Sequence, residues 1–175
     1  MESRDKKALS EVDICDLFIT PAINNAGWDP MRQIRREVTL APGPVVIRGS
    51  MSARNKRKKK FADYILSWEP GIPIAVVEAK DNNHTVSHGI QQALGYAEIL
   101  EVPSALSSNG DAFASHNKVP APGEDIETEL PLEAFPTPQE LWKRYKQFRG
   151  ISDKAEELVV QPYHDDPTGD RKSVV

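Results

Sequence analysis

The sequence predicts an α/β fold in a single domain, on three observations. The chain has 175 residues, enough for one domain with a sizeable core and too few for two full domains. Two segments, 61–68 and 73–79, are rich in β-branched and aromatic residues, as strands are. The segment 87–101 follows them and carries apolar residues at helical spacing. A hydrophobic content of 39% and a mean hydropathy of -0.50 are typical of a soluble globular protein.

The N-terminal part is predicted to hold one helix and an extended region. Ser10 and Asp13 resemble a helix capping box ahead of an apolar stripe, so we expect a helix near 10–20 that Pro21 interrupts. Residues 33–48 contain many β-branched residues divided by the turn Ala-Pro-Gly-Pro at 41–44, which suggests a hairpin or two short strands. A polar loop is expected at 50–60.

The clearest hairpin joins 61–68 to 73–79 through Glu69-Pro70-Gly71-Ile72. A loop rich in Asn and His follows, and then the helix at 87–101, whose apolar face should pack on the sheet.

The C-terminal half is predicted to contain a short strand pair, a loop and two helices. The strands follow Pro103 and turn at Asn109-Gly110, and 117–136 is expected to be a loop because it is rich in proline and acid. Thr137-Pro138-Gln139-Glu140 predicts a helix at 138–148 that Gly150 ends, and 152–160 suggests a shorter one. Residues 161–175 have no apolar period, and the chain ends as though cut from something longer.

The first twenty residues lack the apolar core of a signal peptide or a membrane span, so a cytoplasmic location is expected. Cys15 is the only cysteine, which excludes an internal disulfide framework and favours a small buried apolar residue.

Positive charge is concentrated in one run, although the net charge of -4 is unfavourable for a nucleic-acid binder. Six cations occupy seven positions in this run: Arg54, Lys56, Arg57, Lys58, Lys59 and Lys60. Such runs are often only solvated loops, but this one directly precedes Asp63 and could bind DNA phosphates.

Two carboxylates are predicted to meet in the hairpin, because a centre between Pro70 and Gly71 places Asp63 directly opposite Glu78. Directly opposed like charges destabilise an antiparallel pair. A divalent cation held by both would offset the repulsion, and oxygen ligands of this kind suit Mg²⁺.

Strand geometry puts Lys80 on the same face as Glu78, while the backbone carbonyl of Ala79 is a further candidate ligand. An ammonium beside a metal could orient the nucleophile or stabilise the transition state of phosphodiester hydrolysis. The alternative is an ordinary surface pair at a strand end, with Asp63 merely ending the basic loop.

Other polar residues have both a catalytic and a structural interpretation. Gln92 and Tyr96 lie four apart on the predicted helix and could face the same cleft, or be ordinary half-exposed residues. Glu11 is either an extra metal ligand or an acid that complements the helix dipole. His84 and His88 have no third potential ligand at a spacing typical of a metal site, so a polar loop is favoured there.

These residues resemble a known signature. Ala62-Asp63-Tyr64 followed by Ala75-Val76-Val77-Glu78-Ala79-Lys80 resembles that of the PD-(D/E)XK nucleases, with Ala62 in place of the proline. Gln92-Ala-Leu-Gly-Tyr96 is similar to the Q-x-x-x-Y motif of the restriction (R) subunit of type I restriction-modification enzymes, and is the more specific of the two. The resemblance covers most of the chain, including Ala26-Gly27-Trp28, Ser108-Asn109-Gly110 and Glu140-Leu141-Trp142.

The resemblance implies a restriction-endonuclease-like core, with a central mixed β-sheet flanked by helices, over 1–150. It implies that 151–175 is a linker toward a helicase-like translocase domain, which uses ATP, whereas this chain has no P-loop sequence. The implied partners are duplex DNA and the methyltransferase and specificity subunits, with no membrane. The implied metal-binding acids are Asp63 and Glu78, and less securely Glu11. The implied catalytic lysine is Lys80, with Gln92 and Tyr96 as the motif pair.

The sequence is compatible with three functions. The first is an endonuclease domain that cuts duplex DNA with Mg²⁺, sequence choice being made by other subunits. The second is a catalytically dormant domain of the same fold that docks DNA or a subunit. The third is a stand-alone endonuclease, which the chain's cut-off end disfavours.

Overall fold

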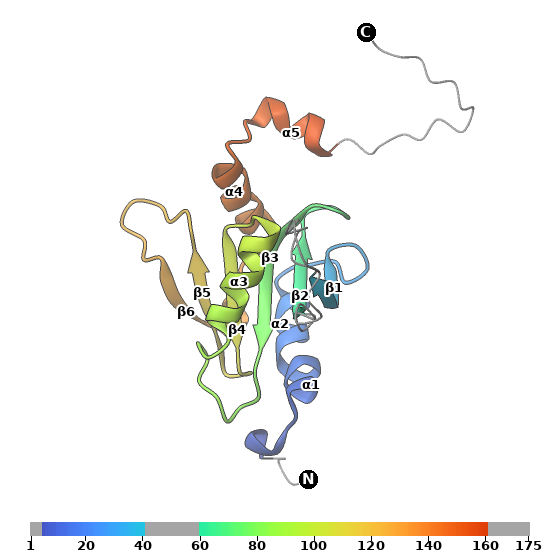
Figure 1. Ribbon diagram of the computed structural model, residues 1–175, viewed down its shortest axis with the longest axis vertical. Coiled ribbons are helices and arrows are strands. Elements are labelled where there is room, and N and C mark those ends of the chain that lie inside the picture. Colours follow the sequence, from blue (N-terminus) through green and yellow to red (C-terminus); the bar gives the residue numbers. More distant parts are fainter. Residues whose placement is uncertain (1–4, 41–59, 161–175) are drawn as a thin grey trace, which may run out of the picture.

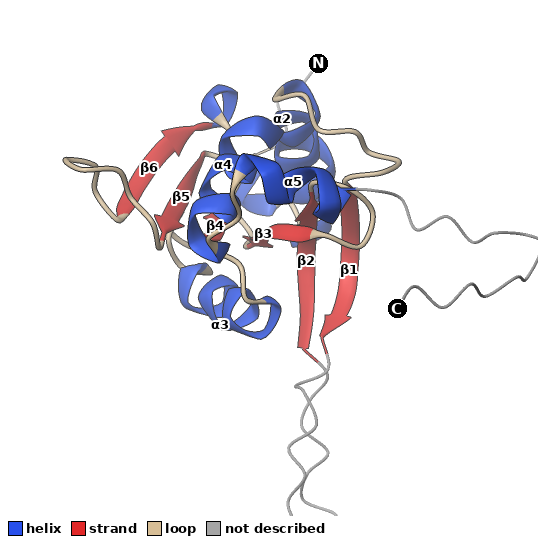
Figure 2. Cartoon of the chain, turned by 90° about the horizontal axis from the view of Figure 1, so that it is seen from above, coloured by secondary structure: helices blue, strands red, loops and turns tan. Residues whose placement is uncertain are grey.

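The computed structural model describes residues 5–40 and 60–160, which form one six-stranded sheet with helices on both faces (Figures 1 and 2). The strands lie side by side in chain order: β1 (Ile34–Leu40), β2 (Lys60–Ser67), β3 (Pro73–Ala79), β4 (Ser104–Ser108), β5 (Ala112–Asn117) and β6 (Glu127–Pro131). β3 and β4 are parallel, and all other neighbours are antiparallel. The predicted α/β fold with a central mixed sheet flanked by helices is confirmed.

The helices cover the sheet unequally. α3 (Ile90–Leu100) connects β3 to β4 and lies on one face, while α2 (Thr20–Asn25) and α4 (Pro138–Arg149) lie on the other (Figure 2). The remaining helical segments are short: η1 (Lys6–Ala8), α1 (Glu11–Ile14), η2 (Cys15–Ile19), η4 (Leu132–Ala134) and α5 (Asp153–Val160). β3 is buried along nearly its whole length, as expected for a strand covered on both faces.

The prediction that Pro21 interrupts the first helix was wrong. The capping box at Ser10 and Asp13 is present, but the helical segment continues through η2, a π-helical turn, into α2 and ends at Asn25. Pro21 lies in the first turn of α2, where its missing N–H costs little. The wider π turn just before it relieves the clash that a proline ring makes in a regular helix.

The prediction of a loop over 117–136 was also wrong, because it contains β6 and η4. β6 is an edge strand that is exposed along most of its length, so it lacks the apolar alternation by which strands are recognised. The other elements agree with prediction, including the capping box of Thr137 and Glu140 that starts α4 and the turn at Gly110. Residues 41–48 of the predicted extended region and 50–59 of the predicted polar loop lie outside the described residues, and Lys60 belongs to β2.

None of the helices in the described ranges is long and apolar enough to cross a membrane.

Candidate active site

The β2–β3 hairpin has the predicted register next to the proposed site. Tyr64 pairs with Val77 and Ile65 with Val76, so the next position brings Asp63 opposite Glu78. The antiparallel pairing ends there, and Asp63 Oδ2 instead accepts a hydrogen bond of 2.8 Å from the Ala79 amide. A β-bulge lies at Leu66 and Ser67, nearer the turn, and leaves this end of the hairpin in register.

Glu78 is a buried carboxylate with an incomplete set of partners. Only 2% of the residue is exposed. Its Oε1 lies 3.2 Å from Lys80 Nζ, whereas its Oε2 has no hydrogen-bond partner within the described part of the chain. Burial, and then the nearby charge of Asp63, raise the pKa of Glu78 to about 8 although Lys80 opposes them. An orphaned buried oxygen of this kind calls for a cation or a proton.

Lys80 joins the carboxylates to α3. Its ammonium donates to Glu78 Oε1 and, at 3.1 Å, to Gln92 Oε1. Gln92 Nε2 in turn donates to Tyr96 Oη at 2.7 Å. Burial lowers the pKa of Lys80, but the Glu78 carboxylate outweighs it and the pKa lies above the usual value, so the lysine is a cation. The structure therefore brings together all five predicted catalytic residues.

Glu11 lies near the same carboxylates. It is half-buried in the first turn of α1. Burial raises its pKa, and the negative charge of Asp63 raises it further. This places the Glu11 carboxyl within electrostatic reach of Asp63, while its role as a metal ligand stays a prediction.

The oxygen atoms at this site fit Mg²⁺ better than a metal that needs a full protein cage. Among the described residues, no three His, Cys, Asp or Glu side chains converge into a ready metal cluster. Mg²⁺ is commonly held by one or two carboxylates and keeps several waters, so Asp63 and Glu78 would suffice. The Ala79 carbonyl remains a predicted ligand.

Two comparisons with known proteins found relatives of this chain. No family model matches the sequence. The chain is 43% identical over 161 residues, 92% of its length, to the type I restriction enzyme EcoAI endonuclease subunit of Escherichia coli. A solved fragment described as an HsdR subunit of a type I restriction enzyme from Vibrio vulnificus superposes with a TM-score of 0.70, at 39% identity over 89% of this chain.

The chain is homologous to part of HsdR, the endonuclease subunit of type I restriction enzymes. It spans 20% of the length of the Escherichia coli relative and 29% of the Vibrio fragment. The shared structure confirms the restriction-endonuclease-like core that the sequence resemblance implied.

Of the basic run predicted to bind DNA, the structure describes only Lys60. Arg54, Lys56, Arg57, Lys58 and Lys59 lie outside the described residues, and Lys60 begins β2 three positions before Asp63. Contact of this run with DNA stays a prediction.

His84 and His88 form a polar loop as expected, with their rings 4.3 Å apart and His84 Nδ1 3.0 Å from Asp81 Oδ1.

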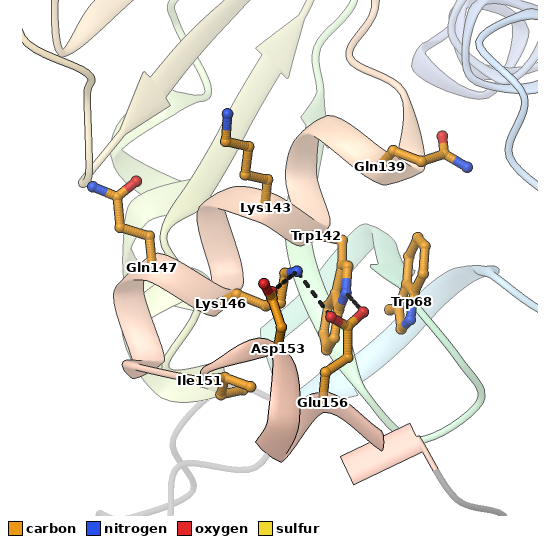
Figure 3. A pocket seen from close by; sticks show the side chains of 9 residues that line it. All are labelled: Trp68, Gln139, Trp142, Lys143, Lys146, Gln147, Ile151, Asp153 and Glu156. Carbon is orange, nitrogen blue, oxygen red and sulfur yellow. Dashed lines mark hydrogen bonds and ion pairs between the residues drawn. The ribbon is translucent and has the colours of Figure 1, made fainter. Parts of the chain in front are cut away.

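A cavity of about 580 Å³ lies at the opposite end of β2, between Trp68, α4 and α5 (Figure 3). The rings of Trp68 and Trp142 stack there at 5.0 Å, and Glu156 of α5 accepts hydrogen bonds from Trp142 Nε1 and Lys146 Nζ. Asp63 lies in β2 and Trp68 directly follows it, so the two are five residues apart along the chain, a span of roughly 16 Å. None of the predicted site residues lines this cavity, so it is not the candidate active site.

Sequence reasoning missed two residues that contact Glu78. Ser107 is its partner in the parallel β3–β4 pair, and Gly89 is the N-cap of α3. The hairpin count could not find them, because the register of a parallel pair is not set by a tight turn.

Proposed function

We propose that this chain is a Mg²⁺-dependent endonuclease domain that hydrolyses phosphodiester bonds of duplex DNA within a type I restriction enzyme. The observation that carries the proposal is the buried Glu78 carboxylate beside Asp63 and Lys80, whose Oε2 has no hydrogen-bond partner in the described ranges 5–40 and 60–160. The names of the two relatives, an endonuclease subunit and an HsdR subunit, support the reaction class.

Each residue has a distinct role in the proposed reaction. Asp63 and Glu78 would hold the cation, with the Ala79 carbonyl and Glu11 as further candidate ligands. Bound Mg²⁺ would supply charge neutralisation at the scissile phosphate and lower the pKa of a coordinated water.

Lys80 would place its positive charge beside the phosphate as negative charge develops in the transition state. Gln92 accepts from Lys80 and donates to Tyr96, so this pair orients the ammonium. The pair would also offer polar groups to the DNA backbone, and the cations between Arg54 and Lys60 would attract neighbouring phosphates.

The targeting of this chemistry would come from elsewhere in the enzyme. We propose that a helicase-like translocase domain of the same subunit uses ATP to bring duplex DNA to the site. The methyltransferase and specificity subunits would choose the sequence. This chain would then have no role in reading the base sequence.

A calorimetric titration with Mg²⁺ tests the metal site. Compared with the unmodified protein, Asp63→Ala and Glu78→Ala are expected to weaken binding more than about tenfold, because each removes a charged ligand. Glu69→Ala is the matched control, since Glu69 pairs with Arg32 at the far end of β2. Equal Mg²⁺ binding by all four proteins would contradict the assignment.

Cleavage needs its own test in the assembled enzyme with ATP. Lys80→Ala is expected to abolish cutting while ATP-driven translocation continues, because the substitution leaves the translocase untouched. Normal cutting by this variant would show that Lys80 is not catalytic. Normal Mg²⁺ binding by a wild-type complex that never cuts DNA would instead indicate a dormant docking domain.

A further inference from the structure

Gly89 lies so close to Glu78 that no other residue fits without displacement. A Cβ added to Gly89 would lie 2.9 Å from Glu78 Cγ and 3.1 Å from Ser107 Oγ. The backbone of Gly89 has φ -86° and ψ -1°, which other residues also adopt. The glycine is therefore required by the space that Glu78 occupies and not by backbone conformation.

Ser107 fixes the segment that carries Gly89 against the sheet. It is fully buried in β4 and lies directly beside Glu78 in the parallel pair. Its Oγ accepts a hydrogen bond of 3.1 Å from the Gly89 amide and donates one of 2.6 Å to the Val86 carbonyl. The hydroxyl thus holds the chain just before α3 both as a donor and as an acceptor.

Gly89 and Ser107 together form a seat for the Glu78 side chain, which we call the Glu78 seat. The seat packs against the aliphatic part of Glu78 and makes no hydrogen bond to its carboxylate. One carboxylate oxygen accepts from Lys80, and the other has no hydrogen-bond partner among the residues that the structure describes. A side chain confined in this way presents the free oxygen without having to lose rotamer freedom on binding.

We infer that Gly89 and Ser107 are positioning residues that hold Glu78 ready to bind the metal ion. The role in metal binding rests on the proposed function, whereas the Glu78 seat is a packing arrangement that exists without metal. The two parts can therefore be tested separately.

The packing part is tested by a thermodynamic cycle measured in chelator. Gly89→Ala is expected to lower the melting temperature by roughly 4–8 °C, because the new methyl group overpacks the site. The same change in a Glu78→Ala background should cost far less, because Cγ of Glu78 is then gone. Gly95→Ala is the matched control on the same helix, where an added Cβ has nothing within 4 Å. Equal costs of Gly89→Ala in both backgrounds would overturn the seat.

The positioning part is tested by Mg²⁺ titration of Ser107→Ala against Ser104→Ala. Ser104 is an equally buried serine of β4 whose Oγ has no partner among residues 5–40 and 60–160, so its removal should change nothing. Ser107→Ala is expected to weaken Mg²⁺ binding at least about tenfold, as loss of an outer positioning group does. Circular dichroism of each variant verifies the fold.

The outcomes separate the two ideas. Wild-type affinity in Ser107→Ala would overturn the positioning role while Glu78→Ala still loses metal. An unchanged Mg²⁺ affinity in Glu78→Ala would instead overturn the proposed function, and the positioning role with it. The cycle in chelator reports on the seat in either case.

Discussion

Glu78 is a residue whose environment lowers the stability of the metal-free protein. Its carboxylate is removed from water, faces the charge of Asp63 and has one oxygen with no hydrogen-bond partner in the described part of the chain. Each of these features disfavours the ionised form in the absence of metal. A divalent cation at the proposed metal site would offset each of them, and stability would then be given up here for binding.

The raised pKa of Glu78 predicts a pH dependence of stability in metal-free protein. Because the folded protein keeps this proton up to about pH 8 and the unfolded chain loses it near 4.5, stability should fall as pH rises between these values. Glu78→Gln cannot titrate, so its melting temperature should exceed that of the unmodified protein by at least about 2 °C at pH 8. The difference should vanish near pH 4. Thermal unfolding in chelator across this range measures it, and a constant difference would contradict the prediction.

At the scale of the element, edge strand β1 carries a local irregularity beside the site. Arg36 pairs with Tyr64 and Val38 with Ala62, so the residue between them, Glu37, lies across from Asp63. Glu37 has φ 52°, a left-handed conformation that is uncommon for a residue with a side chain. The strand is therefore strained where it passes the candidate active site.

Glu37→Gly should stabilise the protein by about 0.5–1 kcal/mol, because glycine adopts this conformation freely and only part of the gain is lost to its flexibility when unfolded. Glu37→Ala removes the same carboxylate but keeps a Cβ, so it should give no such gain. Urea unfolding of the three proteins measures the effect. An equal gain from alanine would assign it to charge and not to backbone strain.

At the scale of the whole molecule, the two ends of the sheet carry separate features. The carboxylates and Lys80 lie at one end, and the cavity with its stacked tryptophans lies at the other. α5 is attached to α4 by Glu156, which contacts Trp142 at 2.6 Å and Lys146 at 2.9 Å (Figure 3). Sites this far apart, without shared partners, are expected to respond independently.

Glu156→Ala should therefore loosen α5 and leave the metal site unchanged. Hydrogen exchange at the amides of 153–160 is expected to become roughly tenfold faster, because the helix loses the two hydrogen bonds that Glu156 makes to α4 and keeps only the longer one from Lys146 to Asp153. Trp142 fluorescence should change as its ring nitrogen loses its acceptor. Mg²⁺ affinity should equal that of the unmodified protein, and a shift in affinity would reveal coupling between the ends.

Local patterns determined much of this structure. The capping box at Thr137 and Glu140 predicted α4 because a helix start is settled by neighbours in sequence. The turn at Pro70 and Gly71 predicted the register that sets Asp63 against Glu78 for the same reason. Local patterns failed where their signal was weak. The exposed strand β6 shows no alternation of apolar and polar residues, and Pro21 led to the wrong expectation that the first helix ends there, whereas it continues through a π turn.

By itself, the sequence determined the hairpin, its two carboxylates and the lysine two positions on, because a tight turn fixes which residues oppose each other. Only the tertiary structure decided what surrounds them. α3 brings Gln92 to Lys80, and the parallel pairing of β4 brings Ser107 beside Glu78. A parallel register depends on how the crossover helix packs on the sheet, and that packing is a property of the whole core that no short stretch of sequence contains.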